Sequence, residues 1–325
     1  MNQLIKEKPQ VLVTRGIPPK GLDLLNKYFE VTVGAWDRML SREELLDLVR
    51  GKEALLSMLT DRVDGELMEI ATDLKVVSNL AVGFDNIDVE EATRRGIAVT
   101  HTPEVLTDAT ADLAFALLLD VARRVTEGDR LIRAGQWKEW APLFHLGKNV
   151  SGSTLGIIGL GRIGQAVAKR ARGFEMKVVY HSRTQLPSVE EKLGIRYLPL
   201  QELLQQADFV SLHAPYNHQT HHLIGWEALS QMKKSAYLIN TSRGALVDEP
   251  ALVKALQQGE IAGAGLDVYE DEPRLTSGLA DLNSVVLAPH LGSATWETRG
   301  QMAVTAAQNI VAELCGIGVA KRINP

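Results

Sequence analysis

A glycine-rich turn lies near the middle of the chain, where residues 153–164 read STLGIIGLGRIG. The glycines fit the pattern G-x-G-x-x-G, an apolar run that predicts a strand precedes them, and a helical pattern follows them. Gly159 would permit the tight turn, Gly161 would let a pyrophosphate approach the backbone, and Gly164 would let helix and strand pack closely. The stretch therefore predicts a dinucleotide-binding βαβ unit.

The residues around and after this turn indicate which dinucleotide binds. The free N–H groups at the helix start, near Arg162 and Ile163, would hold the pyrophosphate. In NAD-binding proteins a carboxylate at the end of the second strand accepts hydrogen bonds from the ribose, but residues 176–189 contain none. The side chains that can donate to a 2′-phosphate there are Ser182, Arg183 and Thr184. We therefore predict NADP(H) as the preferred cofactor, with NAD(H) also possible.

Short β-branched runs alternate with helical patterns along most of the chain, which is typical of parallel sheets built from βαβ units. In the first third the predicted strands are residues 10–15, 30–34, 54–59, 74–79 and 97–102. From the glycine turn onward they are residues 153–159, 176–182, 208–215, 235–242, 263–269 and 284–290. One long helical stretch, residues 102–135 with Pro103 near its start, is predicted to connect the two sets.

These patterns predict an α/β protein of two domains. Residues 103–294 would form a Rossmann-type, doubly wound parallel sheet that binds the dinucleotide, and residues 1–102 a smaller, flavodoxin-like substrate domain. Residues 295–315 predict a final helix that has no sheet of its own. We expect this helix to return to the first domain, so that residues 295–325 belong to it and the domain is discontinuous in sequence.

The composition of the 325 residues, 45% apolar and 23% charged, is that of a globular protein. A net charge of −5 argues against nucleic acid or an anionic membrane as the main partner. The single cysteine, Cys315, can form neither an internal disulfide nor a metal cluster, so we expect no metal site. The N-terminal stretch lacks a long apolar run, and a cytoplasmic protein is expected.

Three of the later predicted strands are followed by residues suited to catalysis. They are Arg243 in NTSRG, Asp267 and Glu272 in LDVYEDEP, and His290 in LAPHLGS. The carboxyl ends of parallel strands meet at the crevice where ligands bind, so these groups can converge. A lone histidine is commonly a packed residue, but this convergence favours a catalytic one. Ordinary surface carboxylates remain the alternative interpretation of Asp267 and Glu272.

The motifs GLGRIG, NTSRG, DVYEDEP and PHLGS, in this order and over nearly the whole chain, resemble those of the D-isomer-specific 2-hydroxyacid dehydrogenase family. The resemblance implies a homodimer and a catalytic set of Arg243, Glu272 and His290. The further cofactor contacts that it implies are His213, Ala214, Pro215, Thr220, Thr241, Ser242, Asp267, Gly292 and Ser293.

The roles of the three catalytic candidates follow from their chemistry. Arg243 would bind a 2-keto acid through its carboxylate and polarise the ketone. His290, as an imidazolium, would donate the proton to the carbonyl oxygen while hydride arrives from the nicotinamide. Glu272, hydrogen-bonded to the other ring nitrogen, would orient the ring and favour its charged form.

The resemblance extends to the segment NLAVGFDNID, residues 79–88, which matches the family's loop after a strand. It implies that the backbone N–H groups of Val82 and Gly83 hold the substrate carboxylate, since glycine permits a close approach. Leu59, in SMLT, would contribute to the opposite wall. A cleft between the two domains would close on binding and exclude water.

Two further segments are ambiguous. WKEWAPLF, residues 137–144, is an aromatic cluster of the kind found in cores or interfaces, and the resemblance places it near a dimer partner, where Trp140 could reach a substrate pocket. HQTHH, residues 218–222, suggests a metal-binding tract, but no acidic ligand lies near it in sequence. We expect it on a solvated turn beside the cofactor.

The favoured function is reduction of small 2-keto acids, such as glyoxylate or hydroxypyruvate, as in the family's glyoxylate and hydroxypyruvate reductase branch. Reduction of 2-ketogluconate and oxidation of D-3-phosphoglycerate would use the same residues and remain alternatives, with phosphite and formate oxidation as minor ones. A cofactor-gated binding protein resembling the family's corepressors is the alternative from another class. Binding alone needs no proton donor, so the joint presence of Arg243, Glu272 and His290 argues for an enzyme.

Overall fold

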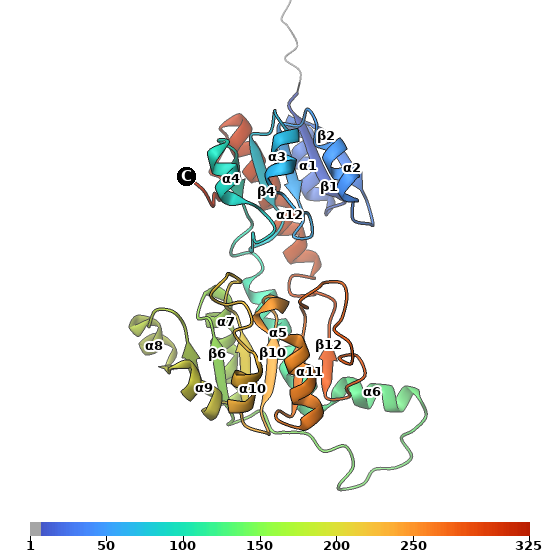
Figure 1. Ribbon diagram of the computed structural model, residues 1–325, viewed down its shortest axis with the longest axis vertical. Coiled ribbons are helices and arrows are strands. Elements are labelled where there is room, and N and C mark those ends of the chain that lie inside the picture. Colours follow the sequence, from blue (N-terminus) through green and yellow to red (C-terminus); the bar gives the residue numbers. More distant parts are fainter. Residues whose placement is uncertain (1–7) are drawn as a thin grey trace, which may run out of the picture. The chain divides into compact units, whose positions relative to one another are not determined.

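The computed structural model describes residues 8–325, which form two compact units. Unit 1 comprises the described residues up to Leu106 together with Thr295–Pro325, and unit 2 comprises Thr107–Ala294. Each unit has a parallel sheet with helices on both faces (Figure 1). The predicted α/β fold class is confirmed.

The sheet of unit 1 has five parallel strands in the order β2-β1-β3-β4-β5. The strands are β1 (Gln10–Arg15), β2 (Glu30–Ala35), β3 (Ala54–Ser57), β4 (Val76–Asn79) and β5 (Ala98–Thr100). This is the flavodoxin-like strand order, in which loops at the carboxyl ends of the strands carry the binding groups. Most of β1 and all of β3, β4 and β5 are buried, because helices cover both faces.

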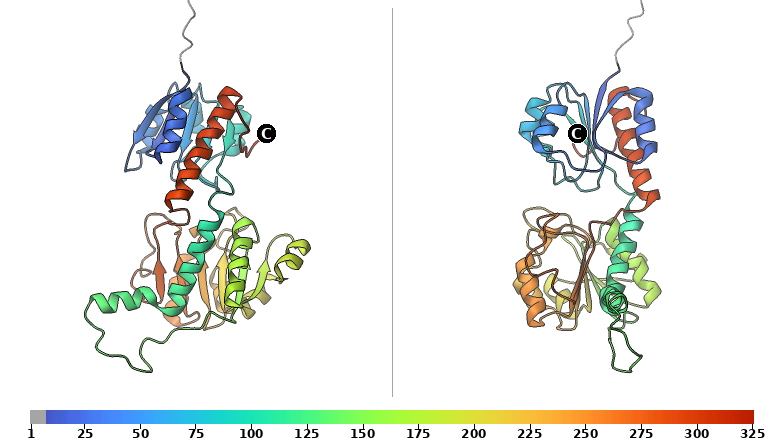
Figure 2. Two further views of the ribbon diagram at one scale, coloured as in Figure 1. Left: turned by 180° about the vertical axis from the view of Figure 1, so that it is seen from behind. Right: turned by 90° about the vertical axis from the view of Figure 1, so that its right-hand side faces the viewer.

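Two helices cover one face of this sheet, and three cover the other. The first face carries α1 (Pro19–Tyr28) and α12 (Trp296–Cys315), and the second carries α2 (Arg42–Leu48), α3 (Gly65–Ile70) and α4 (Val89–Arg94). The views of Figure 2 show α1 and α12 side by side. A side chain at Gly21 of α1 would collide with Ala303 of α12, so the two helices approach closely there. The last helix of the chain thus completes the first unit.

The sheet of unit 2 has seven parallel strands in the order β12-β11-β10-β9-β6-β7-β8. The strands are β6 (Thr154–Ile158), β7 (Lys177–His181), β8 (Arg196–Tyr197), β9 (Phe209–Leu212), β10 (Tyr237–Asn240), β11 (Gly263–Leu266) and β12 (Val285–Leu287). The order reverses between β6 and β9, which is the switch point of a doubly wound sheet. The sequence predicted six of these strands and missed β8, because two residues at a sheet edge leave no periodic signal.

Helices cover both faces of the second sheet. The core on one face includes residues of α9 (Leu200–Gln206), α10 (Trp226–Gln231) and α11 (Glu249–Gln258). The core on the other face includes residues of α5 (Thr107–Arg123), α7 (Arg162–Ala171) and α8 (Pro187–Leu193). Two short 3₁₀ turns, η1 (Arg172–Phe174) and η2 (Gly244–Leu246), follow α7 and β10.

The single long helix predicted over residues 102–135 is wrong. The structure has α5, which begins at Thr107, and a separate helix α6 (Val125–Arg133). Arg124 breaks the helix because its φ is +55°, in the left-handed region. The carboxylate of Asp120 then caps α6, accepting hydrogen bonds from the N–H and hydroxyl of Thr126. The apolar spacing runs through this break and hides it from the sequence pattern.

Within residues 8–325 no helix combines the length and apolar character needed to cross a membrane.

Candidate active site

The candidate catalytic residues follow three neighbouring strands of unit 2. Strands β10, β11 and β12 lie side by side and run parallel, so their carboxyl ends share one edge of the sheet. Arg243 lies three residues beyond β10, Asp267 directly follows β11, and His290 lies three residues beyond β12. The chain after Asp267 turns so that Glu272 returns to the same edge, as its contact with His290 shows.

His290 and Glu272 form a direct pair. The ring Nδ1 of His290 lies 2.8 Å from Oε2 of Glu272, and each side chain is a little under one-third exposed. The other carboxylate oxygen accepts a hydrogen bond of 3.1 Å from the N–H of Tyr269. Burial alone would raise the pKa of Glu272, but the hydrogen bond and charge of His290, the Tyr269 N–H and the charge of Arg243 outweigh it and lower that pKa. Glu272 is therefore a carboxylate that fixes the imidazole.

Asp267 holds the loop that carries His290. The side chain of Asp267 is fully buried, and its two oxygens accept from the N–H groups of Leu291, at 2.6 Å, and Gly292, at 2.8 Å. Its carbonyl accepts from the N–H of His290 at 2.9 Å. His290 has a φ of +55°, which is uncommon for a residue with a Cβ. Three bonds to one residue thus keep this backbone in place.

The loop that carries Arg243 is pressed against the loop that carries Glu272. A side chain at Gly244 would lie 1.8 Å from the carbonyl carbon of Tyr269, so only glycine fits there. Asn240 donates from Nδ2 to the carbonyl of Arg243 at 2.8 Å, and Nη1 of Arg243 donates to the carbonyl of Ser242 at 2.8 Å. The guanidinium charge of Arg243 makes the smallest contribution to the lowered pKa of Glu272, after His290 and the N–H of Tyr269. The structure thus brings together Arg243, Glu272 and His290.

The glycine turn joins β6 to α7 at the switch point of the same sheet. Gly159 has a φ of +94°, and a Cβ there would lie 2.5 Å from the N atom of Ala214 in the turn after β9. A Cβ at Gly164 would lie 2.2 Å from the carbonyl oxygen of Gly159. A Cβ at Gly161, in contrast, would meet no protein atom within 4 Å. The turn therefore leaves open space in front of the α7 N-terminus.

This space fits the pyrophosphate of a dinucleotide. Gly161 precedes the first turn of α7, which begins at Arg162 and Ile163 and has no side-chain cap, so its N–H groups can bind an anion. A second feature agrees: the hydroxyl of Thr241, after β10, is buried and has no hydrogen-bond partner among the described residues. A buried polar atom of this kind is expected where a ligand supplies the missing partner.

The turn after β9 is fixed to its neighbours. The N–H of His213 donates to the carbonyl of Ile158, and the hydroxyl of Ser242 donates to the carbonyl of Ala214 at 2.6 Å. The hydroxyl of Thr220 donates to the carbonyl of Pro215 at 2.8 Å. Burial lowers the pKa of His213 to about 4, so its ring is neutral at physiological pH. The predicted cofactor contacts in this turn thus border the glycine turn and the residues after β10.

The residues predicted to contact the ribose 2′ group lie directly after β7. Ser182, Arg183 and Thr184 follow the end of β7, and Arg183 and Thr184 are exposed. The hydroxyl of Ser182 donates to the carbonyl of Thr184 at 2.6 Å, so it would have to turn to donate to a phosphate. Gly292 and Ser293 follow His290, and the carbonyl of Gly292 accepts from the hydroxyl of Thr110 in α5 at 3.1 Å.

The HQTHH segment has an acidic partner that is distant in sequence, since Nε2 of His222 lies 2.6 Å from Oε1 of Glu270. The partner is 48 residues away in sequence, which is why the pattern did not reveal it. His221 stacks on His222 with ring centroids 3.9 Å apart. Residues 8–325 contain no group of three or more His, Cys, Asp or Glu side chains that could hold a metal ion.

Sequence reasoning missed the residues that hold the catalytic candidates in place. The hydroxyl of Thr110 donates to the carbonyl of Gly292, 182 residues away, and the N–H of Tyr269 donates to the carboxylate of Glu272. The glycine in NTSRG was the one available signal, since a glycine directly after a functional arginine indicates a close backbone approach.

In unit 1, the predicted substrate residues lie on loops at the carboxyl ends of β3 and β4. Leu59 is 36% exposed, and Val82 and Gly83 are half-buried. These loops are therefore open to a ligand.

The fold and the strand-end residues define a dinucleotide-dependent dehydrogenase. A family model described as the NAD-binding domain of D-isomer specific 2-hydroxyacid dehydrogenases matches residues 115–292. The chain belongs to this family, and the resemblance stated from the sequence is confirmed.

Relatives agree over almost the whole chain. A glyoxylate reductase of Thermococcus litoralis is 54% identical over 309 residues, which cover 94% of this chain and 93% of the relative. A crystal structure of a protein from Thermus thermophilus is 49% identical, with a TM-score of 0.91 and coverage of 97% and 99%. The NADPH-dependent glyoxylate/hydroxypyruvate reductase of Sinorhizobium meliloti, solved with NADP and malonate, is 34% identical, with a TM-score of 0.84 and coverage of 98% and 97%.

Proposed function

We propose that the protein reduces glyoxylate, and related small 2-keto acids such as hydroxypyruvate, to 2-hydroxy acids with a hydride from NAD(P)H. The observation that carries this proposal is the His290–Glu272 pair, which lies beside Arg243 at the carboxyl ends of adjacent strands. The glyoxylate reductase of Thermococcus litoralis, 54% identical, supports the substrate class.

Each of the three residues has a role set by its contacts. The Nδ1 atom of His290 is engaged by Glu272, so Nε2 is the ring atom that donates the proton to the substrate carbonyl oxygen. Glu272 keeps the ring oriented and stabilises its charged form. Arg243 binds the substrate carboxylate and polarises the ketone through charge-assisted hydrogen bonds. The reduced nicotinamide, when bound, supplies the hydride.

The cofactor is held by the glycine turn and by the turns after β7, β9 and β10. Gly161 leaves room for the pyrophosphate, which the first N–H groups of α7 bind. The absence of a carboxylate after β7, together with Arg183, favours NADP(H) over NAD(H). The NADP complex of the Sinorhizobium meliloti enzyme supports this preference. The other cofactor contacts proposed from sequence, among them Asp267 and Ser293, remain proposals.

In unit 1, the N–H groups of Val82 and Gly83 bind the substrate carboxylate, and Leu59 contributes an apolar contact. We also propose a homodimer. Its support is a row of exposed apolar side chains in unit 2, of which Trp140 is 78% exposed and Leu143 is 84% exposed.

The remaining alternatives have less support. Reduction of 2-ketogluconate or oxidation of D-3-phosphoglycerate would use the same three residues, but the relative at 54% identity is a glyoxylate reductase. A binding protein of the corepressor type would not need a histidine held for proton donation.

A panel of 2-keto acids tested with both nicotinamides addresses this function. We expect turnover of glyoxylate and hydroxypyruvate to exceed that of 2-ketogluconate, with a lower KM for NADPH than for NADH. The Arg183→Ala variant should raise the KM for NADPH about tenfold, because one charge-assisted contact of about 1.5 kcal/mol is lost, and leave the KM for NADH unchanged. No turnover on the panel would favour the binding-protein alternative, and equal effects on both nicotinamides would remove the role of Arg183.

A further inference from the structure

The loop between β4 and α4 in unit 1 has an unusual set of backbone contacts. Three successive carbonyl groups in it each accept hydrogen bonds from residues outside the loop, so the orientation of three successive peptide groups is fixed. The pairs are Ala81 with the N–H and hydroxyl of Thr102, at 2.9 and 3.1 Å, Val82 with Nδ1 of His101, at 2.9 Å, and Gly83 with Nδ2 of Asn79, at 2.9 Å.

Because peptide groups are planar, these contacts also fix the direction of the N–H groups in the loop. In a trans peptide the N–H of one residue points opposite to the carbonyl of the residue before it. The N–H groups of Val82, Gly83 and Phe84 therefore face away from the side chains that hold the preceding carbonyls. Among the described residues, these three N–H groups make no backbone–backbone hydrogen bond outside helices and strands. Successive N–H groups of this kind form a concave site for an anion.

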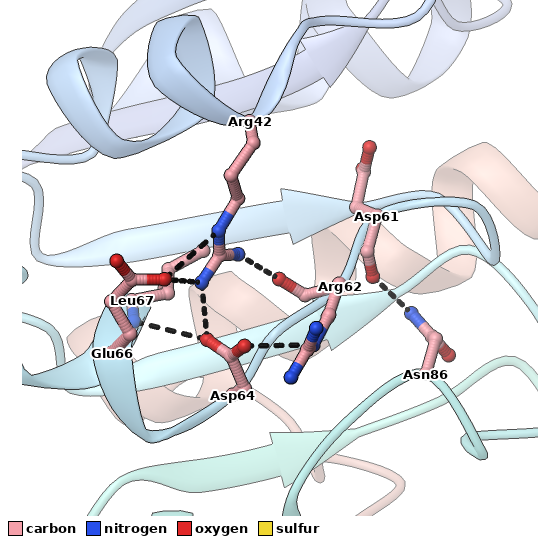
Figure 3. Close-up of polar contacts among 7 residues, drawn as sticks. All are labelled: Arg42, Asp61, Arg62, Asp64, Glu66, Leu67 and Asn86. Atoms are coloured by element: carbon pink, nitrogen blue, oxygen red, sulfur yellow. Dashed lines mark hydrogen bonds and ion pairs between the residues drawn. The ribbon is translucent and has the colours of Figure 1, made fainter.

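Asn79 is itself held firmly. It is fully buried, accepts from the hydroxyl of Ser57 at 3.0 Å, and exchanges two amide hydrogen bonds with Asn86, at 3.0 and 3.3 Å. Asn86 donates in turn to the carbonyls of Met58 and Asp61, each at 3.0 Å. Figure 3 shows the contact between Asn86 and Asp61. The amide pair thus ties the loop to the turn after β3, which contains Leu59.

The turn after β3 is anchored as well. The carboxylate of Asp61 accepts from the N–H of Met58 and from the hydroxyl of Thr14, and burial raises its pKa. Next to it, Arg42 of α2 pairs with Asp64 and Glu66 at the start of α3 (Figure 3). This turn is therefore a rigid support for the amide pair.

Hydrogen bonds fix the backbone of His101, and its ring contacts the loop. Its carbonyl accepts from Nδ2 of Asn309 in α12 at 2.9 Å, and its N–H donates to the carbonyl of Lys321 at 3.1 Å. A carbonyl can only accept, so Nδ1 carries the proton that it donates to Val82. The ring also contacts Phe84 edge-on, with centroids 6.2 Å apart. The side chain of His101 therefore contacts the residue before Gly83, at the carbonyl of Val82, and the residue after it, at the ring of Phe84.

We infer that His101 and Asn79 are positioning residues that pre-form a carboxylate site from the N–H groups of Val82, Gly83 and Phe84. The inference rests on the proposed function, because that function places the substrate carboxylate on this loop. It adds a third donor, Phe84, and assigns the geometry of the site to two side chains that do not touch the substrate. Their effect is on binding of the carboxylate and not on the proton or hydride step.

Three substitutions at His101 separate the hydrogen bond from the ring. His101→Phe keeps a ring against Phe84 but has no donor, His101→Ala removes both, and His101→Asn places an amide donor near the former Nδ1. Ser78→Ala is the matched control, since it removes one buried hydrogen bond, to the carbonyl of Ala306, and does not touch the loop. For each variant we would measure the melting temperature, the KM and kcat with glyoxylate, the KM for NADPH, and the Kd of oxalate by calorimetry. Oxalate offers the same carboxylate and cannot be reduced in place of a ketone.

The expected result is a split between KM and kcat. His101→Phe should raise the KM for glyoxylate and the Kd of oxalate about five- to tenfold, the effect of one hydrogen bond, with kcat and the KM for NADPH unchanged. His101→Ala should do at least as much, His101→Asn should recover most of the loss, and Ser78→Ala should lower only the melting temperature.

The outcomes separate this inference from the proposed function. If the wild type reduces glyoxylate while His101→Phe and His101→Ala keep its KM and the oxalate Kd, the inference is overturned and the function stands. If the wild type does not reduce glyoxylate but His101→Phe weakens oxalate binding, the function fails and the inference stands. A wild type that binds no oxalate and reduces no glyoxylate would overturn both.

Discussion

The backbone at His290 has a conformation that few residues with a Cβ adopt, and the contacts of Asp267 maintain it. A strained φ persists only where surrounding bonds over-determine it, and such residues are concentrated at functional sites. The imidazole on this backbone contacts Glu272, which engages Nδ1 and leaves Nε2 for a substrate. Glu272 can hold the imidazole in this way only while it is a carboxylate.

That state predicts a pH dependence of stability. The pKa of Glu272 is lower in the folded protein than its ordinary value of 4.5. Above pH 4.5 the carboxylate therefore stabilises the folded state, and this contribution is lost as the pH falls through the lower pKa of the folded protein. The difference in free energy of unfolding between wild type and Glu272→Gln should therefore be largest near neutral pH and shrink below pH 4.5. Denaturant unfolding curves from neutral to acidic pH would measure it.

The control for this experiment is Glu191→Gln, which alters an exposed glutamate of α8. Its unfolding free energy should follow that of the wild type at every pH. A difference between wild type and Glu272→Gln that stays constant with pH would show that the carboxylate is not stabilised in the folded state.

The positions of single residues could be predicted from the sequence where those residues directly follow parallel strands. Arg243 and His290 lie just beyond neighbouring strands, so their shared edge could be inferred without coordinates. The pairing of His222 with Glu270 could not be inferred in this way, because it depends on how two loops fold towards each other.

At the scale of elements, the β6–α7 turn depends on three glycines for three different reasons. Gly159 adopts a positive φ and approaches the turn after β9, and Gly164 lies against the carbonyl of Gly159. Gly161 meets no protein atom, so the protein alone does not require a glycine there. We propose that the bound pyrophosphate, which would lie against this backbone, is what favours a glycine at position 161.

Alanine substitutions at Gly164 and Gly161 should therefore affect different properties, the first stability and the second cofactor binding. Gly164→Ala should lower the free energy of unfolding by about 1–3 kcal/mol, because its Cβ collides with backbone. Gly161→Ala should leave stability unchanged and weaken NADPH binding. Thermal unfolding and NADPH fluorescence titration would distinguish the two. Gly173→Ala is the control, since that position is also open but lies in η1 at the far end of α7. Unaltered NADPH affinity in Gly161→Ala would contradict the proposed place of the pyrophosphate.

Elements with a strong periodic signal were predictable, and short or interrupted ones were not. The five strands of unit 1 follow clear apolar runs, although β3, β4 and β5 are shorter than their runs. The break between α5 and α6 depends on one left-handed residue, Arg124, and on a cap from Asp120. An arginine carries no preference for that conformation, so the sequence gives no sign of it.

For the whole molecule, the main unexplained feature of the isolated chain is its exposed apolar surface. Residues 137–146 carry Trp140 and Leu143, and α6 exposes Val125 and Ile132. Of the two places expected for the WKEWAPLF segment, a core or an interface, its exposure in the isolated chain excludes the core, and we propose the interface. Large exposed apolar patches are typical of protein–protein interaction sites.

We expect the chain to form a dimer through this surface. Trp140→Ser combined with Leu143→Ser should convert the dimer to a monomer in light scattering after gel filtration, because two anchors of the buried patch are lost. Trp296→Ser is the matched control, since Trp296 in α12 is 90% exposed and lies outside this surface. A wild-type chain that is monomeric, or a double variant that remains dimeric, would contradict the proposal.

The most direct test of the account is the glyoxylate-dependent oxidation of NADPH by wild type and His290→Ala, with NADPH affinity measured on the same samples by fluorescence. We expect turnover to fall about 10²–10⁴-fold in the variant while NADPH affinity is unchanged, because His290 acts only as the proton donor. Equal losses of turnover and NADPH affinity in a folded variant, or turnover that survives the substitution, would contradict it.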